Sequence, residues 1–431
     1  MGVVLTVAII TITAFICSIM FLPQISVGKK LKIKIYPFIP LLGAGFMLIL
    51  GGARMGEIVG AFVEDSSVNP IRILILFLSM TVFSLILEQT GFFEHISGVI
   101  LQKSGHSQYK IFLSLYTVIS VLTIFTSNDI VILTFTPFIC HFCRAAKIDA
   151  IPYLIMEFVA ANTWSLLLLI GNPTNIYISG AFEIGFAEYA RTMALPTVAA
   201  GLMSLLVMCL MFRKKLSGEI TVNTEIAPIT DRVLMWVSLL HLAACVILLA
   251  VSQYIGAEMW SISLWMAISA LICSALCIVF RKKSLSPIGR AIAKMPYEII
   301  PFIIGMFIIV LALEQNDITR LIGELLAFDR SVFSFGLLSF LFSNVLNNIP
   351  MSVLFSKILG ESSTAGQIYA TIVGSNLGAF ITPVGALAGI MWSNLLKQNH
   401  VNLSTLKFIG MGIMIGVPSV AAALITLELL V

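Results

Sequence analysis

Charged residues are scarce in this sequence. Only 11% of its 431 residues are Asp, Glu, Lys or Arg, and 59% are hydrophobic. About a quarter of the residues in an average soluble domain are charged. A chain with so little charge cannot shield its apolar surface from water, which excludes a soluble enzyme, a disordered chain and a nucleic-acid-binding protein. The composition is typical of a polytopic membrane protein, in which each spanning helix takes about 20 residues.

Several chemical motifs are also missing. The chain has no Gly-x-x-x-x-Gly-Lys loop for ATP, no Gly-x-Ser-x-Gly nucleophile and no His-Glu-x-x-His zinc motif. Its seven cysteines lie in apolar stretches, which predicts free thiols and no disulfide framework. The string Cys140-His141-Phe142-Cys143 has no second cluster to complete a metal site, so buried thiols are the better interpretation. We therefore expect no enzyme activity, no catalytic residues, no metal site and no cofactor.

The apolar runs of the sequence predict ten membrane-spanning segments, separated by polar and helix-breaking residues. They are expected at residues 3–22, 36–53, 70–88, 151–185, 190–212, 233–254, 259–280, 297–314, 365–397 and 405–427.

Two further apolar segments, 108–146 and 331–360, are too long for one helix. Each has a polar turn at its middle, Thr126-Ser127-Asn128-Asp129 in the first and Asn347-Asn348-Ile349-Pro350 in the second. A polar turn at membrane depth is tolerated only where protein or a water-filled cavity surrounds it. We therefore interpret both segments as re-entrant hairpins, although two full crossings in each place would leave the loops on the same sides.

The basic residues are distributed unevenly over the loops. Lys103 and Lys110 precede the central part of the first hairpin, and Arg144 and Lys147 follow it. Most of the 25 Lys and Arg residues fall on the same side as these four when ten crossings and two hairpins are assumed. Because basic loops stay in the cytoplasm, the pattern predicts a multi-pass protein of the cell membrane with both termini outside.

The chain also repeats itself. The matching motifs are Pro70…Glu88-Gln89 with Pro296…Glu314-Gln315, Ser127-Asn128 with Asn347-Asn348, and Asn162…Ile170-Gly171 with Asn376…Val384-Gly385. The predicted organisation is a first repeat at 1–215, with hairpin 108–146 and a helix break at 170–175, a cytoplasmic linker at 216–232, and a second repeat at 233–431, with hairpin 331–360 and a break at 382–385.

The expected fold is thus all-α, with about ten transmembrane helices and two re-entrant hairpins in two repeats. Five crossings in each half is an odd number, so the halves must be inserted with opposite orientation. Inverted repeats with paired helix breaks are typical of secondary transporters. A duplicated helical bundle without transport activity is the alternative.

The two hairpin turns and the two helix breaks form four polar clusters. Pro173 lacks a backbone donor and Gly171 frees the chain, so the helix must unwind there and expose polar backbone groups to a ligand, an ion or water. Half-helix ends also carry partial charges that attract ions. The predicted substrate-binding residues are Thr126, Ser127, Asn128, Gly171, Asn172, Thr174, Asn347, Asn348, Ser375, Asn376, Thr382 and Gly385.

Two acidic residues fall inside predicted membrane segments. An ionisable group there is a functional candidate, so Asp129 is expected to couple transport to H⁺ or Na⁺, although it could also cap the helix that follows. Glu157 is expected either to be a second proton site or to line the cytoplasmic mouth. Glu88 and Glu314 sit at span ends and are better interpreted as solvated.

These motifs resemble the ion transporter superfamily, nearest to the arsenite permease (ArsB) and sodium/proton antiporter (NhaD) branches. The resemblance covers nearly the whole chain. It rests on Ser127-Asn128-Asp129, Thr136-Pro137 and Ile170-Gly171-Asn172-Pro173-Thr174-Asn175, and on Asn347-Asn348-Ile349-Pro350, Gly374-Ser375-Asn376-Leu377-Gly378 and Ile381-Thr382-Pro383-Val384-Gly385. It implies a scaffold domain, a transport domain, an elevator motion and a homodimer, and leaves an ATPase subunit open as a partner.

The resemblance also bears on the substrate. In the more distant divalent anion:sodium symporters the hairpin tips carry Ser-Asn-Thr, whereas here Asp129 replaces the Thr. An acidic tip disfavours a dianion and suits a cation, a proton or a neutral acid such as As(OH)₃. We expect a secondary transporter in the lipid bilayer that moves a small ion or small molecule. Efflux of arsenite or antimonite is the leading prediction. A sodium/proton antiporter and a small carboxylate or oxyanion symporter are the alternatives.

Overall fold

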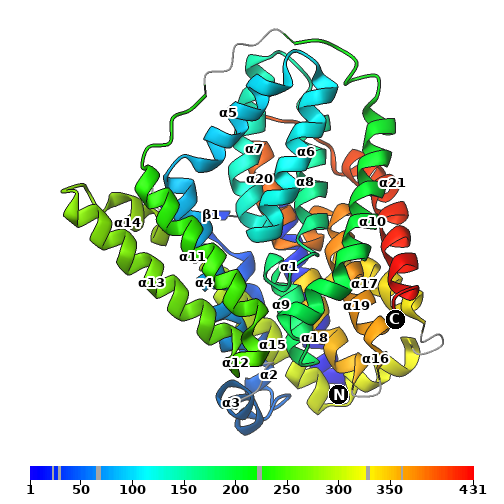
Figure 1. Ribbon diagram of the computed structural model, residues 1–431. Helices are drawn as coiled ribbons and strands as arrows, with labels where there is room; N and C mark the ends of the chain where they lie inside the picture. The colour runs from blue at the N-terminus through cyan, green and yellow to red at the C-terminus, as the bar shows by residue number, and fades with distance from the viewer. Residues whose placement is uncertain (22–23, 28–30, 65–68, 221–225, 327–330, 361–362) are drawn as a thin grey trace.

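The computed structural model describes residues 1–21, 24–27, 31–64, 69–220, 226–326, 331–360 and 363–431, and most of them lie in helices (Figure 1). The helices of the first half are α1 (Gly2–Phe21), α2 (Ile39–Ile49), α3 (Met55–Val63), α4 (Pro70–Gln89), α5 (Phe92–Ser104), α6 (Gln108–Phe125), α7 (Asn128–Ala145), α8 (Ile151–Trp164), α9 (Pro173–Ala181) and α10 (Phe186–Phe212). Those of the second half are α11 (Arg232–Ala250), α12 (Ser252–Ile255), α13 (Met259–Phe280), α14 (Ser286–Ala293), α15 (Ile299–Gln315), α16 (Ile318–Leu326), α17 (Val332–Leu346), α18 (Asn348–Leu359), α19 (Ala365–Leu377), α20 (Leu387–Gln398) and α21 (Thr405–Glu428).

Within the described residues, seven helices are long and apolar enough to cross a membrane: α1, α4, α6, α10, α11, α13 and α21. The bent pair of α15 and α16, which meet at 77°, would make an eighth. The predicted segments 151–185 and 365–397 each divide into two helices, α8 with α9 and α19 with α20. The protein is therefore an all-α polytopic membrane protein, and the total of ten crossings stays a prediction.

One short pair of strands interrupts the helical pattern. Strand β1 (Gln24–Val27) pairs antiparallel with β2 (Leu31–Lys34), with Ile25 opposite Ile33. Polar and apolar residues alternate in both segments, which is the pattern of a strand, but the pair was not expected from the sequence. Lys34 at the end of β2 bonds to Glu298 at the start of α15 and so ties the pair to the helical body.

Helix contacts in one half recur in the other when equivalent helices are exchanged. Helix α2 packs against α15 as α13 packs against α4, and α7 packs against α20 as α18 packs against α9. The α6–α8 contact corresponds to α17–α19, and the equivalent helices α10 and α21 pack on each other. Figure 1 shows α6 and α7 in the upper part of the view and α17 and α18 in the lower part. This reciprocal packing is what a duplicated chain produces, whereas the repeat boundaries and their inverted orientation stay predictions.

The helix breaks lie earlier in the chain than predicted. Helix α8 ends at Trp164 and Pro173 is the first residue of α9, so the first break covers residues 165–172 rather than 170–175. The second covers 378–386, with two short 3₁₀ turns, η3 (Gly378–Phe380) and η4 (Pro383–Gly385), rather than 382–385. The physical reason is that proline suits the first position of a helix, so Pro173 begins a helix instead of ending one.

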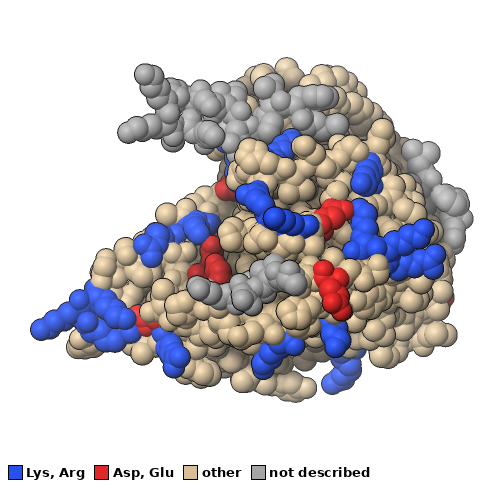
Figure 2. All heavy atoms as spheres, turned by 90° about the horizontal axis from the view of Figure 1, so that it is seen from above, with Lys and Arg blue, Asp and Glu red and all other residues tan. Residues whose placement is uncertain are grey.

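Basic residues gather on one face of the molecule, here called the basic end. Figure 2, the view from above Figure 1, shows many more Lys and Arg than Asp and Glu on that face. Both termini lie in the lower part of Figure 1. Other ion pairs are Arg54–Glu57, Arg72–Glu258, Arg320–Glu324 and Lys357–Glu314. The side of the membrane on which each end lies stays a prediction.

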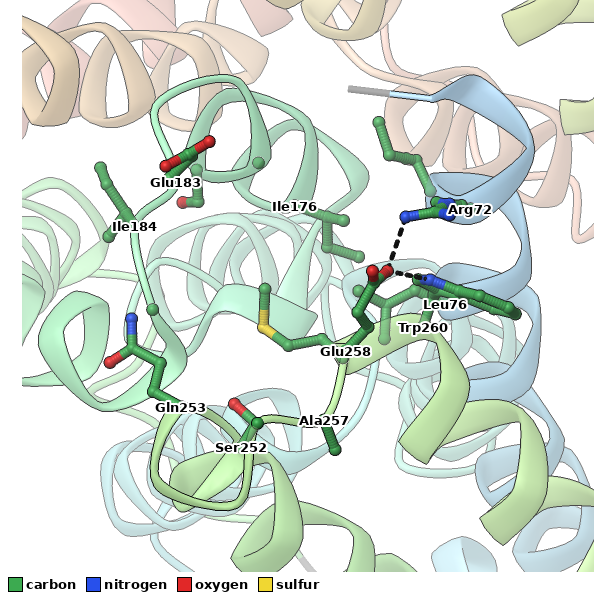
Figure 3. Close-up of a pocket in the computed structure, with 16 residues that line it drawn as sticks. Arg72, Leu76, Ile176, Glu183, Ile184, Ser252, Gln253, Ala257, Glu258 and Trp260 are labelled. Carbon is green, nitrogen blue, oxygen red and sulfur yellow. Dashed lines mark hydrogen bonds and ion pairs between the residues drawn. The ribbon is translucent and has the colours of Figure 1, made fainter. Parts of the chain in front are cut away.

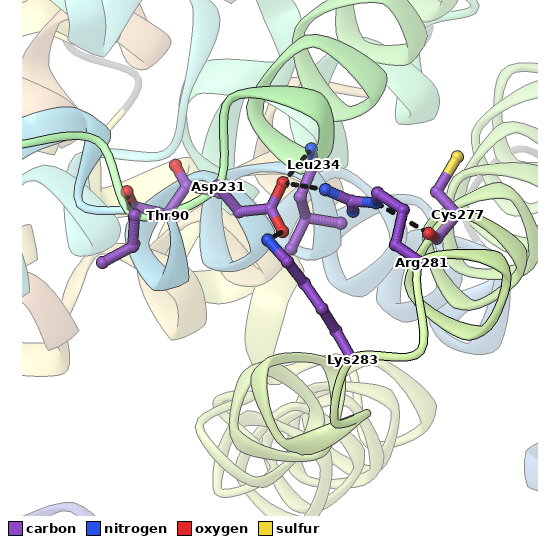
Figure 4. Close-up of polar contacts among 7 residues, drawn as sticks. Thr90, Asp231, Leu234, Cys277, Arg281 and Lys283 are labelled. Atoms are coloured by element: carbon purple, nitrogen blue, oxygen red, sulfur yellow. Dashed lines mark hydrogen bonds and ion pairs between the residues drawn. The ribbon is translucent and has the colours of Figure 1, made fainter.

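One ion-pair cluster joins α11 to α13 at the basic end (Figure 4). Asp231 precedes α11, accepts a hydrogen bond from the Leu234 N–H, and binds Arg281 at 2.7 Å and Lys283 at 3.1 Å. Burial acts to raise the pKa of Asp231, but these hydrogen bonds outweigh it and lower the pKa to about 2. The cluster therefore fixes the ends of two spanning helices through one carboxylate.

Candidate functional site

The first hairpin turn lies between α6 and α7. Ser127 caps α7, and its hydroxyl accepts a hydrogen bond from the Asp129 N–H at 3.3 Å. The Asn128 side chain donates to the Asn162 carbonyl oxygen at 3.1 Å, and Asn162 in turn donates to the Phe158 backbone on α8. These bonds hold the tip of the hairpin against the broken helix of its own half.

The second hairpin turn, between α17 and α18, is held in a similar way. Asn347 has a φ of 75°, a conformation that asparagine tolerates better than most residues, and it donates to the Val384 carbonyl at 2.7 Å. Asn344 accepts hydrogen bonds from the backbone and the hydroxyl of Thr382 at 2.9 and 2.7 Å, and donates to the Gly378 carbonyl at 2.9 Å. This tip is therefore anchored to the second helix break.

A third set of hydrogen bonds crosses between the two halves. Asn172, in the first break, donates to the Asn376 oxygen at 2.8 Å, and Asn376 donates to the Asn175 oxygen at 2.8 Å. Ser375 and Asn376 also donate to the Thr174 hydroxyl, each at 3.3 Å. All five side chains are almost fully buried. Asn376 thus fixes the first break against the end of α19.

The two tips and the two breaks meet at one small cavity. It has a volume of about 10 Å³ and is lined by Asn128, Asp129, Asn172, Pro173, Asn348, Ile349, Ala386, Leu387 and Ala388. This is room for about one water molecule. The conformation therefore holds the site closed around a very small space.

Four helices begin at this cavity. Residues at the starts of α7, α9, α18 and α20 line it, and these helices begin at Asn128, Pro173, Asn348 and Leu387. A helix N-terminus carries unpaired N–H groups and a partial positive charge of about half an elementary charge. Four of them around one cavity create a positive site that suits an anion or the oxygens of a polar solute.

Two side chains in the cavity have unused acceptors. The carboxylate of Asp129, which is 6% exposed, accepts no hydrogen bond from any described residue. The buried Oδ1 of Asn348 is also without a partner among the residues the structure describes. Buried acceptors are usually paired, so these two call for a ligand that donates hydrogen bonds. The cavity thus offers N–H donors from four helices beside two free acceptors.

The other predicted site residues lie around this cavity without lining it. Thr126 bonds to the Leu122 carbonyl and borders an apolar pocket beside α11. A Cβ at Gly171 would lie 2.3 Å from the Ser165 carbonyl oxygen, and one at Gly385 would lie 3.0 Å from Asn344 Oδ1, so both positions require a close backbone approach. The predicted site residues that fix the shape of the site through hydrogen bonds or close packing are Ser127, Gly171, Thr174, Asn347, Ser375, Asn376, Thr382 and Gly385.

Sequence reasoning missed several residues of the site. Asn162 appeared only as a repeat marker, and Asn175 only as part of the Gly-Asn-Pro-Thr-Asn string. Both make hydrogen bonds that hold the site. Asn344 lies in an otherwise apolar run one turn before the second tip, and that position was the available signal. The small residues Ala386 and Ala388 carry no polar signal at all.

The acidic residues outside the cavity differ from one another. Glu157 is fully buried, with 0% exposure, so it borders no open mouth in this conformation, and its role stays a prediction. Helix α8 packs against α6, α7, α10 and α19, and Glu157 accepts a hydrogen bond from Thr136 of α7. Glu88 pairs with Lys294 at 2.7 Å, and Glu314 with Lys357 at 3.0 Å, at helix ends.

In the described part of the chain, no group of three His, Cys, Asp or Glu residues could hold a metal ion.

A much larger pocket lies elsewhere, among α4, α9 and the α12–α13 turn (Figure 3). It has a volume of about 490 Å³, and an ion pair of Arg72 with Glu258 at 2.7 Å lies in its wall. The Arg72 guanidinium also lies 5.3 Å from the centre of the Trp260 ring. None of the hairpin-tip residues lines this pocket, so it is separate from the site of the four helix N-termini.

Paired broken helices and two helical hairpins that meet at a buried polar cavity, within a polytopic membrane fold, define a membrane transporter. The chain belongs to the citrate transporter family CitMHS, which it matches over residues 7–373.

The comparisons with individual proteins agree with this class. The chain is 26% identical over 410 residues to an arsenical pump membrane protein of Escherichia coli, covering 90% of this chain and 92% of that protein. It is 24% identical over 402 residues to a putative arsenical pump membrane protein of Bacillus subtilis, covering 85% and 88%. The crystal structure of the Alcanivorax borkumensis YdaH transporter has the same fold, with a TM-score of 0.58 at 12% identity over 99% of this chain and 97% of that one.

Proposed function

We propose that this protein is a secondary active transporter that moves a small inorganic ion or oxyacid. The leading candidate is the efflux of arsenite or antimonite. The observation that carries the proposal is the cavity where four helix N-termini face two unused acceptors. A neutral trihydroxide such as As(OH)₃ donates through its hydroxyl groups to Asp129 and Asn348. Its oxygen atoms accept hydrogen bonds from the helix N-termini.

The predicted substrate contacts divide into two groups under this proposal. Asn128, Asn172 and Asn348 touch the substrate directly, because they line the cavity. Thr174, Asn376 and Thr382 hold the breaks in shape, because their polar groups bond to protein. Names of relatives that refer to arsenical pumps support the choice of substrate.

Asp129 is proposed as the residue that couples transport to H⁺ or Na⁺. It is the charged side chain among the residues that line the cavity. A carboxylate in this position can hold a cation or a proton in one half of the cycle and the substrate in the other. The cavity is too small for a hydrated ion, so a larger rearrangement must open it to each side in turn. Alternating access, through an elevator motion of the hairpins and broken helices in a homodimer, is the proposed mechanism.

The two alternatives have specific observations in their favour. A sodium/proton antiporter is favoured by the free carboxylate of Asp129. A small carboxylate or oxyanion symporter is favoured by the four helix N-termini and by the family description as a citrate transporter. Against a dianion, the charge of Asp129 would repel it within the same cavity.

Flux measurements in proteoliposomes test the proposal. We expect saturable arsenite or antimonite transport that depends on an ion gradient. An ohmic current without saturation would point to a channel and refute the transporter proposal. Thermal-shift measurements with arsenite, Na⁺, Li⁺, citrate, succinate and sulfate distinguish the three substrate classes, because a ligand that binds the folded state raises the melting temperature.

A further inference from the structure

Glu157 is a buried acid with an incomplete set of partners. Its Oε1 accepts a hydrogen bond from the Thr136 hydroxyl at 2.8 Å, and its Oε2 has no partner among the described residues. The indole Nε1 of Trp392 is also buried and unpaired. The Trp392 ring packs against Phe158 and Phe408, with ring centroids 4.9 Å and 5.4 Å apart, so the indole beside Glu157 has an aromatic environment.

The surroundings of Glu157 suit a proton and no larger cation. A buried carboxylate without a charged partner costs several kcal/mol, and no described basic residue forms an ion pair with it. Hard metal cations need several oxygen ligands, whereas Glu157 has one hydrogen bond from a described side chain, the Thr136 hydroxyl. A proton needs only the single free oxygen.

A recess lies near Glu157 along α7. It has a volume of about 330 Å³ and is lined by Cys140, Cys143 and Arg144 of α7 and by His400 and Val401 after α20. Cys140 lies one helical turn, about 6 Å, beyond Thr136 along α7. The recess therefore ends within one turn of the side chain that binds Glu157.

Glu157 is separate from the substrate cavity. Its partner Thr136 lies seven residues after Asp129, which is about 10 Å along α7. The residues between them on that face of the helix, Ile132 and Leu133, are apolar. The two acids are therefore two sites and not one shared carboxylate pair.

We propose that Glu157 is a proton-carrying residue and that the recess lined by Cys140 is its route to the cytoplasm. A proton from water in the recess binds the free Oε2 and neutralises the carboxylate. In the proposed alternating-access cycle the proton is released to the opposite side of the membrane. The role of Glu157 in transport rests on the proposed function. The exchange of a proton at Glu157 does not depend on that function and is tested separately.

Infrared difference spectroscopy on the purified protein in lipid vesicles tests the proton site directly. Acidification should produce the carbonyl stretch of a protonated carboxylic acid. We expect Glu157→Gln to lose a component of this band that Asp129→Asn retains. A band of unchanged intensity in Glu157→Gln would overturn the proposal.

Two further variants keep the test valid if Glu157→Gln folds poorly. Thr136→Val removes the hydrogen bond to Oε1 and should shift the band in frequency, and an unshifted band would count against Glu157 as its source. Val401→Trp fills the recess and should slow the hydrogen–deuterium exchange of the band, with Val401→Leu as the matched control. Equal exchange rates in both would remove the recess as the route.

Transport supplies the functional readout. Glu157→Gln should exchange arsenite across the membrane at the wild-type rate but lose the accumulation driven by a pH gradient. Wild-type accumulation in this variant would refute the role in coupling. If the wild-type protein itself moves no arsenite, the proposed substrate fails, while the infrared result still decides whether Glu157 binds a proton.

Discussion

Replacing Asn376 with alanine tests whether the hydrogen bonds between the halves hold the site together. The Asn376 amide makes two bonds at 2.8 Å to the first break, one from Asn172 and one to Asn175. Alanine leaves the Asn172 amide nitrogen and the Asn175 amide oxygen without these bonds, and both side chains are buried, with exposures of 1% and 0%. The change removes no charge. Among the residues that line the cavity, Asn376 bonds to Asn172.

The expected loss follows from measured interhelical bonds. Such bonds in membrane proteins are worth about 0.6 kcal/mol on average and up to about 1.7 kcal/mol. Two lost bonds give about 1.2 to 3.4 kcal/mol, and full burial of Asn376 places the loss near the upper end. Because Asn172 lines the cavity, substrate affinity should fall together with stability.

Unfolding by sodium dodecyl sulfate titration in mixed micelles measures the change in free energy. Asn399→Ala is the matched control, since Asn399 is only partly buried and its side chain bonds to a backbone carbonyl of its own helix end. We expect the control to change stability by less than about 0.5 kcal/mol. Equal stability of the two variants would show that the bonds between the halves contribute nothing.

Three further changes are predicted. Asp129→Asn should bind arsenite yet lose gradient-driven transport in proteoliposomes, and unchanged coupled uptake would refute its coupling role. Stability should fall as the pH drops below about 4, because Asp231 has a pKa of about 2 when folded and about 3.9 when unfolded. Its charged form is the stabilising one, so Asp231→Asn should remove this pH dependence of unfolding, and a variant that keeps it would contradict the assignment. Gly171→Ala places a methyl group 2.3 Å from a backbone oxygen and should impair folding and uptake, whereas Gly410→Ala has open space and should not; similar losses in both would argue against the close approach.

Much of the fold was predictable from local pattern. The apolar runs located α1, α4, α10, α11, α13 and α21 to within a few residues, because a spanning helix is a property of about 20 neighbouring residues. The polar turns at Asn128 and Asn348 marked the helix junctions of both hairpins. The break before Pro173 was placed a few residues late, because residues 166–170 near its start are apolar and carry no breaker signal.

The candidate site was only partly predictable. Asp129, Asn128, Asn172 and Asn348 line the cavity, and each stood out as a polar residue in an apolar segment. The roles of Asn162, Asn175 and Asn344 depend on which backbone group or side chain lies opposite, and that is not encoded in spacing. For the same reason, the sequence left two interpretations of Glu157, and only the structure shows that it is buried.

The amino-acid sequence by itself determined that this protein lives in a membrane, where its helices break and which acids remain inside. Those properties follow from composition and from residues close together in the chain. Only the tertiary structure decided that four helix N-termini surround one cavity, and that Asn172 bonds to a residue 204 positions away. A long-range contact depends on the packing of whole helices, so no local pattern contains it. The scarcity of charge thus identified Asp129 and Glu157, and the packing separated them into a cavity residue and a buried acid.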